Sequence, residues 1–215
     1  MVAYILLLIP AAVIAYGIGS MDTLVLASNF VFHTNLRKLG KGNNWISNFR
    51  RVYGIKGILA LLGTELIKDT IPIVIGGLLL ISKGHFTEGC AFAGFCLVIG
   101  RLWPIFYNLK GSHATIALIM AGMWTAPALG VVAAIAAVAV LILSKRLSLA
   151  TIVAAVSMAV IAVLMLDVQI QLILTALTSA AVLLRHIPDI SKMMKGSEEK
   201  IELKEDLSYK FDEEF

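Results

Sequence analysis

The sequence predicts an all-α membrane protein with several spanning helices. Of its 215 residues, 59% are hydrophobic and only 15% are charged, whereas a soluble domain carries about 25% charged residues. Apolar stretches such as 114–143 and 147–166 reach the roughly 18 to 20 residues that a helix needs to cross about 30 Å of hydrocarbon. Helices satisfy their backbone hydrogen bonds internally, as lipid requires. The composition therefore excludes an ordinary soluble domain.

The first three expected helices follow from the first half of the chain. Residues 2–18 are apolar, with no basic residue before them and a basic segment, 37–51, after them. They lack the positive start and small-residue cleavage site of a secretory signal peptide, so we expect a retained helix. Two further helices are expected at 54–80 and 89–105, and the loop between them contains one basic residue, Lys83.

The second half of the chain predicts two helical hairpins. The apolar sequence between Lys110 and Lys145 is too long for one crossing and is interrupted at 124–127. Residues 148–184 are apolar on both sides of Asp167 and are followed by a basic run. Each segment is expected to cross twice, which brings the total to seven transmembrane helices.

The positions of the basic residues predict the orientation. Cytoplasmic loops retain Lys and Arg, and among the expected outer loops only Lys83 is basic. This pattern places the N-terminus outside and the C-terminus in the cytoplasm. Residues 1–190 are expected to form one membrane domain and 191–215 a charged cytoplasmic tail, for which docking of a protein partner is an open alternative. Topology explains the net charge of +4, and no nucleic-acid-binding motif is present.

Charged residues interrupt the second expected span. Glu65, Lys68 and Asp69 would each cost about 2.5 to 3.5 kcal/mol at the centre of a lipid-facing helix, so they are expected to face protein or water. Glu65 and Lys68 stand at i and i+3 and could pair with each other. Alternatively, Lys68 lines a polar cavity and binds an anion.

Three polar segments on the expected cytoplasmic side, 37–51, 108–113 and 185–189, favour a shared anion site. The first is rich in Gly, Asn and Arg, which suit phosphate, and the second precedes a helix N-terminus. In the third, His186 could act as a general base near Asp189. Alternatively, the first segment is a positive-inside loop with turn residues, and His186 is a residue of the membrane interface. Two cysteines have no histidine at metal-ligand spacing, so no metal is expected.

Segments of the chain also follow the motifs of one known family. The sequence R-K-L-G-K-G-N at 37–43 follows R-x-x-G-S-G-N, and Asn48 and Arg51 match the N and R that come later in that motif. The sequence E-L-I-K-D-T-I-P at 65–72 follows D-x-x-K-G-x-x-P.

Residues 100–114 follow G-H-x-x-P-V-F-x-x-F-K-G-G-K-G, residues 148–152 follow S-L-A-S-I, and 185–190 follow R-H-R-E-N-I. The chain thus resembles, in order and over essentially its whole length, the bacterial acyl-phosphate-dependent glycerol-3-phosphate acyltransferases (PlsY type). That family's seven helices and outside N-terminus agree with the orientation predicted from charge.

The resemblance implies a reaction and a set of site residues. An acyl group passes from acyl phosphate to the 1-hydroxyl of glycerol 3-phosphate in the bacterial plasma membrane, without coenzyme A, metal or other cofactor. The substrates and membrane lipid are then the expected partners. The residues implied are Arg51, His186 and Asn48 for catalysis, and Arg37, Lys41, Asn43, Lys68, Lys110, Ser112 and His113 for substrate phosphate.

The chain departs from the family at several motif positions. The substituted positions are Lys41 for Ser, Arg101 for His, Ser112 for Gly, His113 for Lys, Ala114 for Gly and Asp189 for Asn, and an early G-S-I-P is G-S-M-D at 19–22. A His in place of Lys removes a charge that is fixed at pH 7. Two alternatives therefore stay open: an acyltransferase with a different acceptor, or a homologue without catalysis that serves as a subunit or lipid-binding partner in a membrane complex.

Overall fold

The described part of the chain is all-helical. In the computed structural model, residues 2–21, 23, 45–109 and 111–195 are described, except for the side chains of 2–5, 45–53 and 194. These residues form helices and no strand. In chain order the helices are α1 (Val2–Gly19), α3 (Trp45–Ile81), α4 (Phe86–Leu102), the 3-10 helix η2 (Ile105–Tyr107), α5 (Thr115–Thr125), α6 (Pro127–Ser144), α7 (Leu147–Met165), α8 (Gln169–Arg185) and α9 (Ile187–Met194).

Both expected hairpins are confirmed as pairs of helices. The first breaks at Ala126, which is extended with φ −153° and ψ 122°, and α6 begins at Pro127. Proline suits this position because the first residues of a helix have no intrahelical partner for their N–H groups. In the second hairpin, α7 ends at Met165 and α8 begins at Gln169, with Asp167 in the short link, as predicted.

Gly54 divides α3 into two parts. Its φ of 63° and ψ of −160° are not helical, and a glycine adopts such a conformation without steric penalty. The helix from 55 to 81 therefore begins where the second span was expected to begin. Residues 45–53 form a separate helical segment in front of it.

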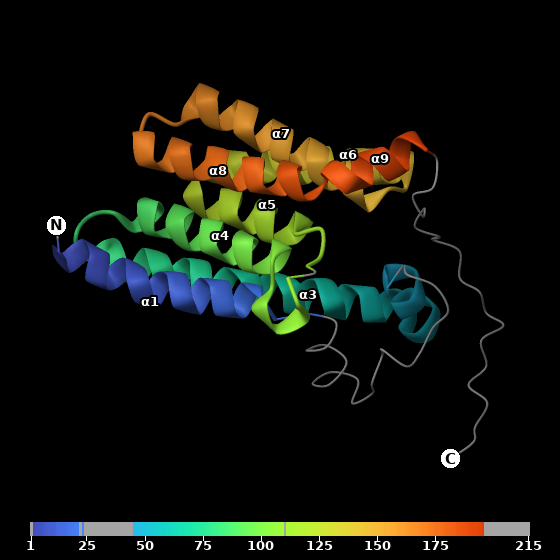
Figure 1. Ribbon diagram of the computed structural model, residues 1–215, viewed down its shortest axis with the longest axis horizontal. Coiled ribbons are helices and arrows are strands. Elements are labelled where there is room, and N and C mark those ends of the chain that lie inside the picture. Colours follow the sequence, from blue (N-terminus) through green and yellow to red (C-terminus); the bar gives the residue numbers. More distant parts are fainter. Residues whose placement is uncertain (1, 22, 24–44, 110, 196–215) are drawn as a thin grey trace, which may run out of the picture.

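Helix α4 lies in the middle of the bundle. It contacts α1, α3, α5 and α8, while α6 packs against α5 and α7, and α7 packs against α8. Figure 1 shows α1 and α3 on one side of α4, and α7 and α8 on the other.

Glycines allow the backbones of α4 and its neighbours to approach closely. A Cβ on Gly89 would lie 2.4 Å from the carbonyl oxygen of Gly76 on α3, and one on Gly100 would lie 2.4 Å from that of Tyr16 on α1. Such contacts are a usual means of packing membrane helices, for which the hydrophobic effect supplies little driving force. They fix α4 against both neighbours.

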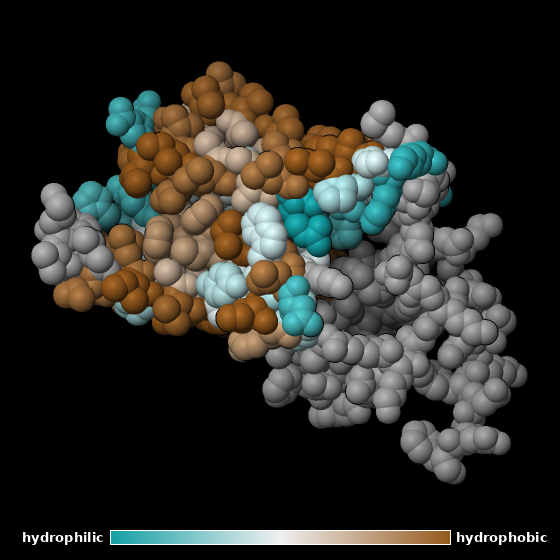
Figure 2. Space-filling model, viewed as in Figure 1, coloured by the Kyte–Doolittle hydropathy of each residue, from teal (hydrophilic) through white to brown (hydrophobic). Residues whose placement is uncertain are grey.

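The described part of the face that Figure 2 shows is largely apolar. Large apolar side chains such as Ile142, Leu143 and Leu164 are exposed on the bundle. Three helical stretches, 86–107, 127–144 and 147–165, are long and apolar enough to cross a membrane, and α8 with α9 would make a fourth, bent by 47°.

A helix is present at each of the seven expected positions, but within the described residues three stretches, or four with the bent pair, are candidate spans by length and composition. Helix α5, with 11 residues, is about 16 Å long, well short of about 30 Å of hydrocarbon. The apolar sequence of α3 is interrupted by the charged residues Glu65, Lys68 and Asp69.

The helices alternate in direction, so their connections fall at two ends of the bundle. One end in Figure 1 holds the end of α1, the start of α3, the α4–α5 and α6–α7 connections, and the α8–α9 junction. The other end holds the start of α1 and the α3–α4, α5–α6 and α7–α8 connections. The described parts of the three predicted polar segments therefore lie toward the same end of the bundle.

Candidate active site

The loop between α4 and α5 folds back onto the end of α4. Asn108, Leu109 and Ala114 have left-handed backbone conformations, with φ between 52° and 59°. A Cβ on Gly111 would lie 2.1 Å from the carbonyl oxygen of Arg101, so only glycine fits there, and the Ser112 N–H donates to that oxygen at 3.3 Å. These turns bring the segment 112–113 back toward the bundle.

His113 is held against the start of α7. Its Nε2 lies 3.0 Å from the Ser148 hydroxyl oxygen. Next to this pair along the two segments, the hydroxyl oxygens of Thr115 on α5 and Thr151 on α7 are 2.5 Å apart. Thr151 also donates a hydrogen bond to the Leu147 carbonyl. A contact from the loop to α7 and a neighbouring contact between α5 and α7 thus hold His113 in position.

His186 lies at the junction of α8 and α9, where the chain bends by 47°. The side chain is buried, with 1% of its surface exposed. Its Nδ1 lies 2.8 Å from the Val182 carbonyl oxygen, and because a carbonyl only accepts, Nδ1 carries the proton. This hydrogen bond orients the ring.

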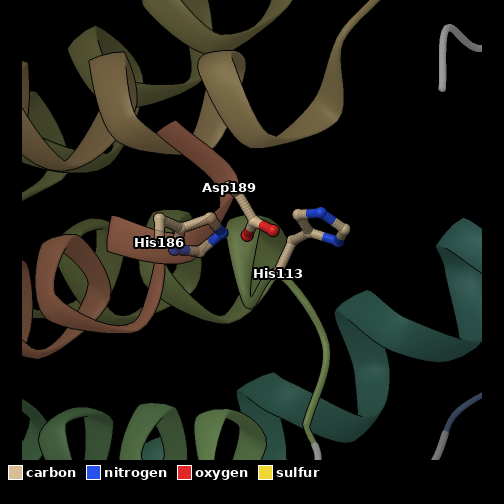
Figure 3. A group of neighbouring side chains, drawn as sticks. All are labelled: His113, His186 and Asp189. Carbon is tan, nitrogen blue, oxygen red and sulfur yellow. The ribbon is translucent and has the colours of Figure 1, made fainter. Parts of the chain in front are cut away.

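The two histidines and Asp189 form one cluster. The imidazole ring centroids of His113 and His186 are 5.5 Å apart, and one nitrogen or oxygen atom from each of the three residues lies within 4.8 Å of the others. In the view of Figure 3, the Asp189 carboxylate lies between the two rings. Proline at the start of α9 ends α8 and sets the turn that brings Asp189 to this position.

His113 is neutral at physiological pH. Burial lowers the pKa of its imidazole to about 4, and nearby His186 adds to the effect while the Asp189 carboxylate opposes it. A neutral imidazole donates or accepts a hydrogen bond but supplies no fixed positive charge. Positive charge at this end comes instead from residues such as Arg185, whose Nη2 donates to the Gly111 carbonyl at 3.3 Å.

The charges inside the bundle pair differently from the expectation for Glu65 and Lys68. Glu65 forms a salt bridge with Arg101 of α4, and Lys68 pairs with Asp69 at 2.8 Å. The expected Glu65–Lys68 pair is therefore wrong. The i, i+3 spacing puts both side chains on one face of α3, but Arg101 from the neighbouring helix reaches Glu65 there.

The predicted site residues fall into four groups. Ser112, His113 and His186 come together at one end of the bundle, whereas Lys68 lies within α3 and pairs with Asp69. Asn48 and Arg51 are in the first part of α3, with side chains outside the described residues. Arg37, Lys41, Asn43 and Lys110 lie outside the described residues altogether.

Two contacting residues were not among the predicted site residues. Ser148 bonds to His113, and Asp189 joins the two histidines. Both stand in segments that the sequence singled out, Ser148 at 148–152 and Asp189 at 185–189. The sequence placed Asp189 near His186 but gave neither Ser148 nor Asp189 the contact with His113, which comes from a distant part of the chain.

Residues 9–196 match the sequence profile of the family described as glycerol-3-phosphate acyltransferase. The chain belongs to this family.

Curated relatives and solved structures agree with the family profile. The glycerol-3-phosphate acyltransferase of Thermoanaerobacter sp. (strain X514) is 28% identical over 191 residues, which are 88% of this chain and 93% of the relative. That of Streptococcus pyogenes serotype M5 (strain Manfredo) is 37% identical over 101 residues, 47% of this chain and 46% of the relative.

The fold is that of an integral membrane protein. The crystal structure of PlsY (YgiH), an integral membrane glycerol 3-phosphate acyltransferase, superposes in its glycerol 3-phosphate form with a TM-score of 0.72 at 21% identity, covering 91% of this chain and 96% of that chain. The lysophosphatidic acid form gives a TM-score of 0.71 at 18% identity, covering 90% and 94%.

Several departures from the glycerol-3-phosphate acyltransferase motifs are in contact with one another. Glu65 and Arg101, which replace Asp and His of the motifs, form one salt bridge. His113 and Asp189, which replace Lys and Asn, form one cluster with the retained His186. The departures thus change interacting groups together.

Proposed function

We propose that this member of the glycerol-3-phosphate acyltransferase family transfers a fatty acyl group from acyl phosphate to the 1-hydroxyl of glycerol 3-phosphate, forming lysophosphatidic acid. The observation that carries the proposal is the family match over residues 9–196, together with the gathering of Ser112, His113 and His186 at one end of the bundle.

The proposed reaction is an acyl transfer between two oxygens. The 1-hydroxyl oxygen attacks the carbonyl carbon of acyl phosphate, the bond from that carbon to the phosphate oxygen breaks, and inorganic phosphate leaves. His186 takes up the hydroxyl proton at Nε2, the nitrogen opposite its hydrogen bond to Val182. A positioned base of this kind typically contributes about 10²–10⁴-fold to a rate.

The two substrates carry phosphate groups, which need cationic and hydrogen-bonding partners. We assign Arg51 and Asn48, together with His186, to catalysis at the reacting groups of the substrates. The substrate phosphates are assigned to Arg37, Lys41, Asn43, Lys68, Lys110, Ser112 and His113. His113, being neutral, contributes a hydrogen bond, so the charge must come from the arginines and lysines.

The proposed setting is a bacterial plasma membrane with seven crossings, the N-terminus outside and the site on the cytoplasmic face. The distribution of Lys and Arg along the chain supports this orientation, and the relatives come from bacteria. Acyl chains then reach the site from the bilayer and glycerol 3-phosphate from the cytoplasm.

A direct assay tests the proposal. Purified protein incubated with acyl phosphates of several chain lengths and glycerol 3-phosphate should release lysophosphatidic acid and phosphate, detected by mass spectrometry. His186→Gln should lower kcat by about 10²–10⁴-fold, while His85→Ala, at the other end of the bundle beside Glu88, serves as the matched control and should leave kcat unchanged. Absence of product at every chain length would contradict the proposed activity.

The substituted motif positions favour one second candidate, a homologue without catalysis that acts as a subunit or lipid-binding partner in a membrane complex. Neutral His113 in place of a lysine is the observation that supports it, and the tail at 191–215 offers a docking segment. An inactive protein that is isolated from native membranes with a stoichiometric partner would favour this candidate, and isolation as a single species would count against it.

A further inference from the structure

His113, His186 and Asp189 form a set of donors that the proposed acyl transfer does not explain as a group. The loop before α5 supplies the first, the α8–α9 junction the second and α9 the third, with one donor atom from each within 4.8 Å of the others (Figure 3). Two imidazoles and a carboxylate are the donors of many zinc sites, and three protein ligands leave a fourth position open.

We propose that His113, His186 and Asp189 bind one divalent transition-metal ion, with Zn²⁺ as the first candidate. Imidazole and carboxylate together favour Zn²⁺ and related ions over Mg²⁺ or Ca²⁺, which prefer oxygen ligands alone. Binding requires no substrate, so this inference does not rest on the proposed function.

Both imidazoles are oriented as metal ligands usually are, by a hydrogen bond at the other ring nitrogen. His186 donates from Nδ1 to the Val182 carbonyl at 2.8 Å and would coordinate through Nε2. His113 contacts the Ser148 hydroxyl through Nε2 at 3.0 Å and would coordinate through Nδ1. The two partners come from α8 and α7, which are rigid parts of the bundle.

The separation of the donor atoms requires a small closure. Bonds of about 2.0–2.2 Å place the ligands of a tetrahedral ion about 3.3–3.6 Å apart, compared with separations of up to 4.8 Å in the cluster. Rotation of the Asp189 side chain, which is only partly buried, would bring its carboxylate closer to the two imidazoles while both rings keep their hydrogen bonds.

Among the described residues, the cationic side chains of Lys192 and Arg185 lie close to the cluster. Lys192 Nζ is 3.6 Å from the Asp189 carboxylate on a side chain that is 62% exposed, so a metal ion can displace it into solvent. Arg185 directs its guanidinium to the Gly111 carbonyl. The cluster therefore remains accessible to a cation from the partly exposed side of His113 and Asp189.

Zn²⁺ titration tests the site. Protein freed of metal with a chelator should bind one Zn²⁺ per chain in competition with a fluorescent chelating dye, and Co²⁺ in its place should give the intense visible absorption of a tetrahedral ion. His113→Ala and Asp189→Asn should each weaken binding by at least about 10-fold, since even outer partners of metal ligands are worth about 10–100-fold.

Two control variants separate this site from other sources of binding. His85→Ala removes the imidazole of the His85–Glu88 pair at the other end of the bundle and should leave affinity unchanged, whereas Lys192→Ala removes a competing cation and should leave it unchanged or raise it. Each variant must keep wild-type helical content, and His113→Gln replaces His113→Ala if the latter does not fold. No stoichiometric binding, or binding unchanged in both ligand variants, would overturn the proposal.

Metal binding has a consequence that does rest on the proposed function. Coordination through Nε2 of His186 occupies the nitrogen that takes up the proton, so Zn²⁺ should inhibit acyl transfer at the concentrations that fill the site, and a chelator should restore it. Activity that is unaffected at full occupancy would contradict the assigned role of His186, while leaving the metal site in place. An inactive protein that still binds Zn²⁺ would contradict only the proposed function.

Discussion

Arg101 links three parts of the bundle through one side chain. It pairs with Glu65 on α3, and its Nη1 donates to the Thr23 hydroxyl at 2.9 Å and to the Met21 carbonyl at 3.3 Å, beyond the end of α1. Glu65 and Arg101 are both less than 10% exposed. A charge in such a place is tolerated because its partner and its hydrogen bonds replace water.

Removing one member of this pair should destabilise the protein strongly. Arg101→Gln or Glu65→Gln leaves a buried charge without its partner, which typically costs about 3–5 kcal/mol. In Glu65→Gln with Arg101→Gln no charge is stranded, so the double variant should lose less than the sum of the single losses. Thermal unfolding of the four proteins in detergent checks this, and additive losses would show that the two residues do not interact.

The titration of His113 should make stability depend on pH. With a pKa of about 4 in the folded protein against about 6.5 in an unfolded chain, the unfolded state binds a proton that the folded state does not. Stability should therefore be constant above about pH 7 and fall as pH decreases from about 6.5 to 4. The loss due to this residue is about 2 kcal/mol by pH 5, as an upper estimate.

Comparison with His113→Gln isolates that contribution. Glutamine keeps a hydrogen-bonding group for Ser148 but does not titrate. In the presence of a chelator, the midpoint of thermal unfolding of the wild type should fall more between pH 7.5 and pH 5 than that of the variant. Equal falls in the two proteins would mean that His113 is protonated to the same extent in the folded and unfolded states.

At the scale of elements, the contact between α3 and α4 depends on the absence of side chains. Gly89→Ala would put a Cβ 2.4 Å from the Gly76 carbonyl oxygen, so the two backbones must separate, and overpacking of this kind typically costs about 1–3 kcal/mol. Gly63→Ala is the matched control on α3, because nothing lies within 4 Å of its Cβ position. It should raise stability by about 0.5–1 kcal/mol.

Unfolding midpoints of these two variants decide whether the contact matters. A fall for Gly89→Ala with a rise for Gly63→Ala is expected. Similar changes in both variants would indicate that only helix propensity is involved and that the helices do not meet at Gly89.

The elements themselves were largely predictable from sequence, whereas their contacts were not. Apolar stretches gave the helices, and the breaks at 126 and 166–168 followed from Pro127 and Asp167, because these signals are local. Glu65 was assigned to its neighbour on α3 since sequence spacing reports only one helix, and its actual partner, Arg101, lies on another. The meeting of His113, His186 and Asp189 likewise depends on how α5, α8 and α9 pack.

At the scale of the whole molecule, the bundle has an apolar outer surface and two distinct ends. Lys83 lies in the α3–α4 connection and Lys145 in the α6–α7 connection, and these connections are at opposite ends in Figure 1. Lysine is retained on the cytoplasmic side of membrane proteins. The described residues of the α4–α5 connection and the α8–α9 junction lie at the same end as the α6–α7 connection, which contains Lys145. The proposed orientation therefore puts the candidate active site on the cytoplasmic side.

Labelling of one introduced cysteine at a time tests this orientation. Lys83→Cys should react with a membrane-impermeant maleimide added outside intact cells, and Lys145→Cys should react only after the membrane is permeabilised. The parent protein is the control, because its free Cys90 and Cys96 lie within α4 and should not react. The reverse pattern would place the histidine cluster outside, where cytoplasmic glycerol 3-phosphate cannot reach it. Labelling of both cysteines from outside would contradict an odd number of membrane crossings between residues 83 and 145.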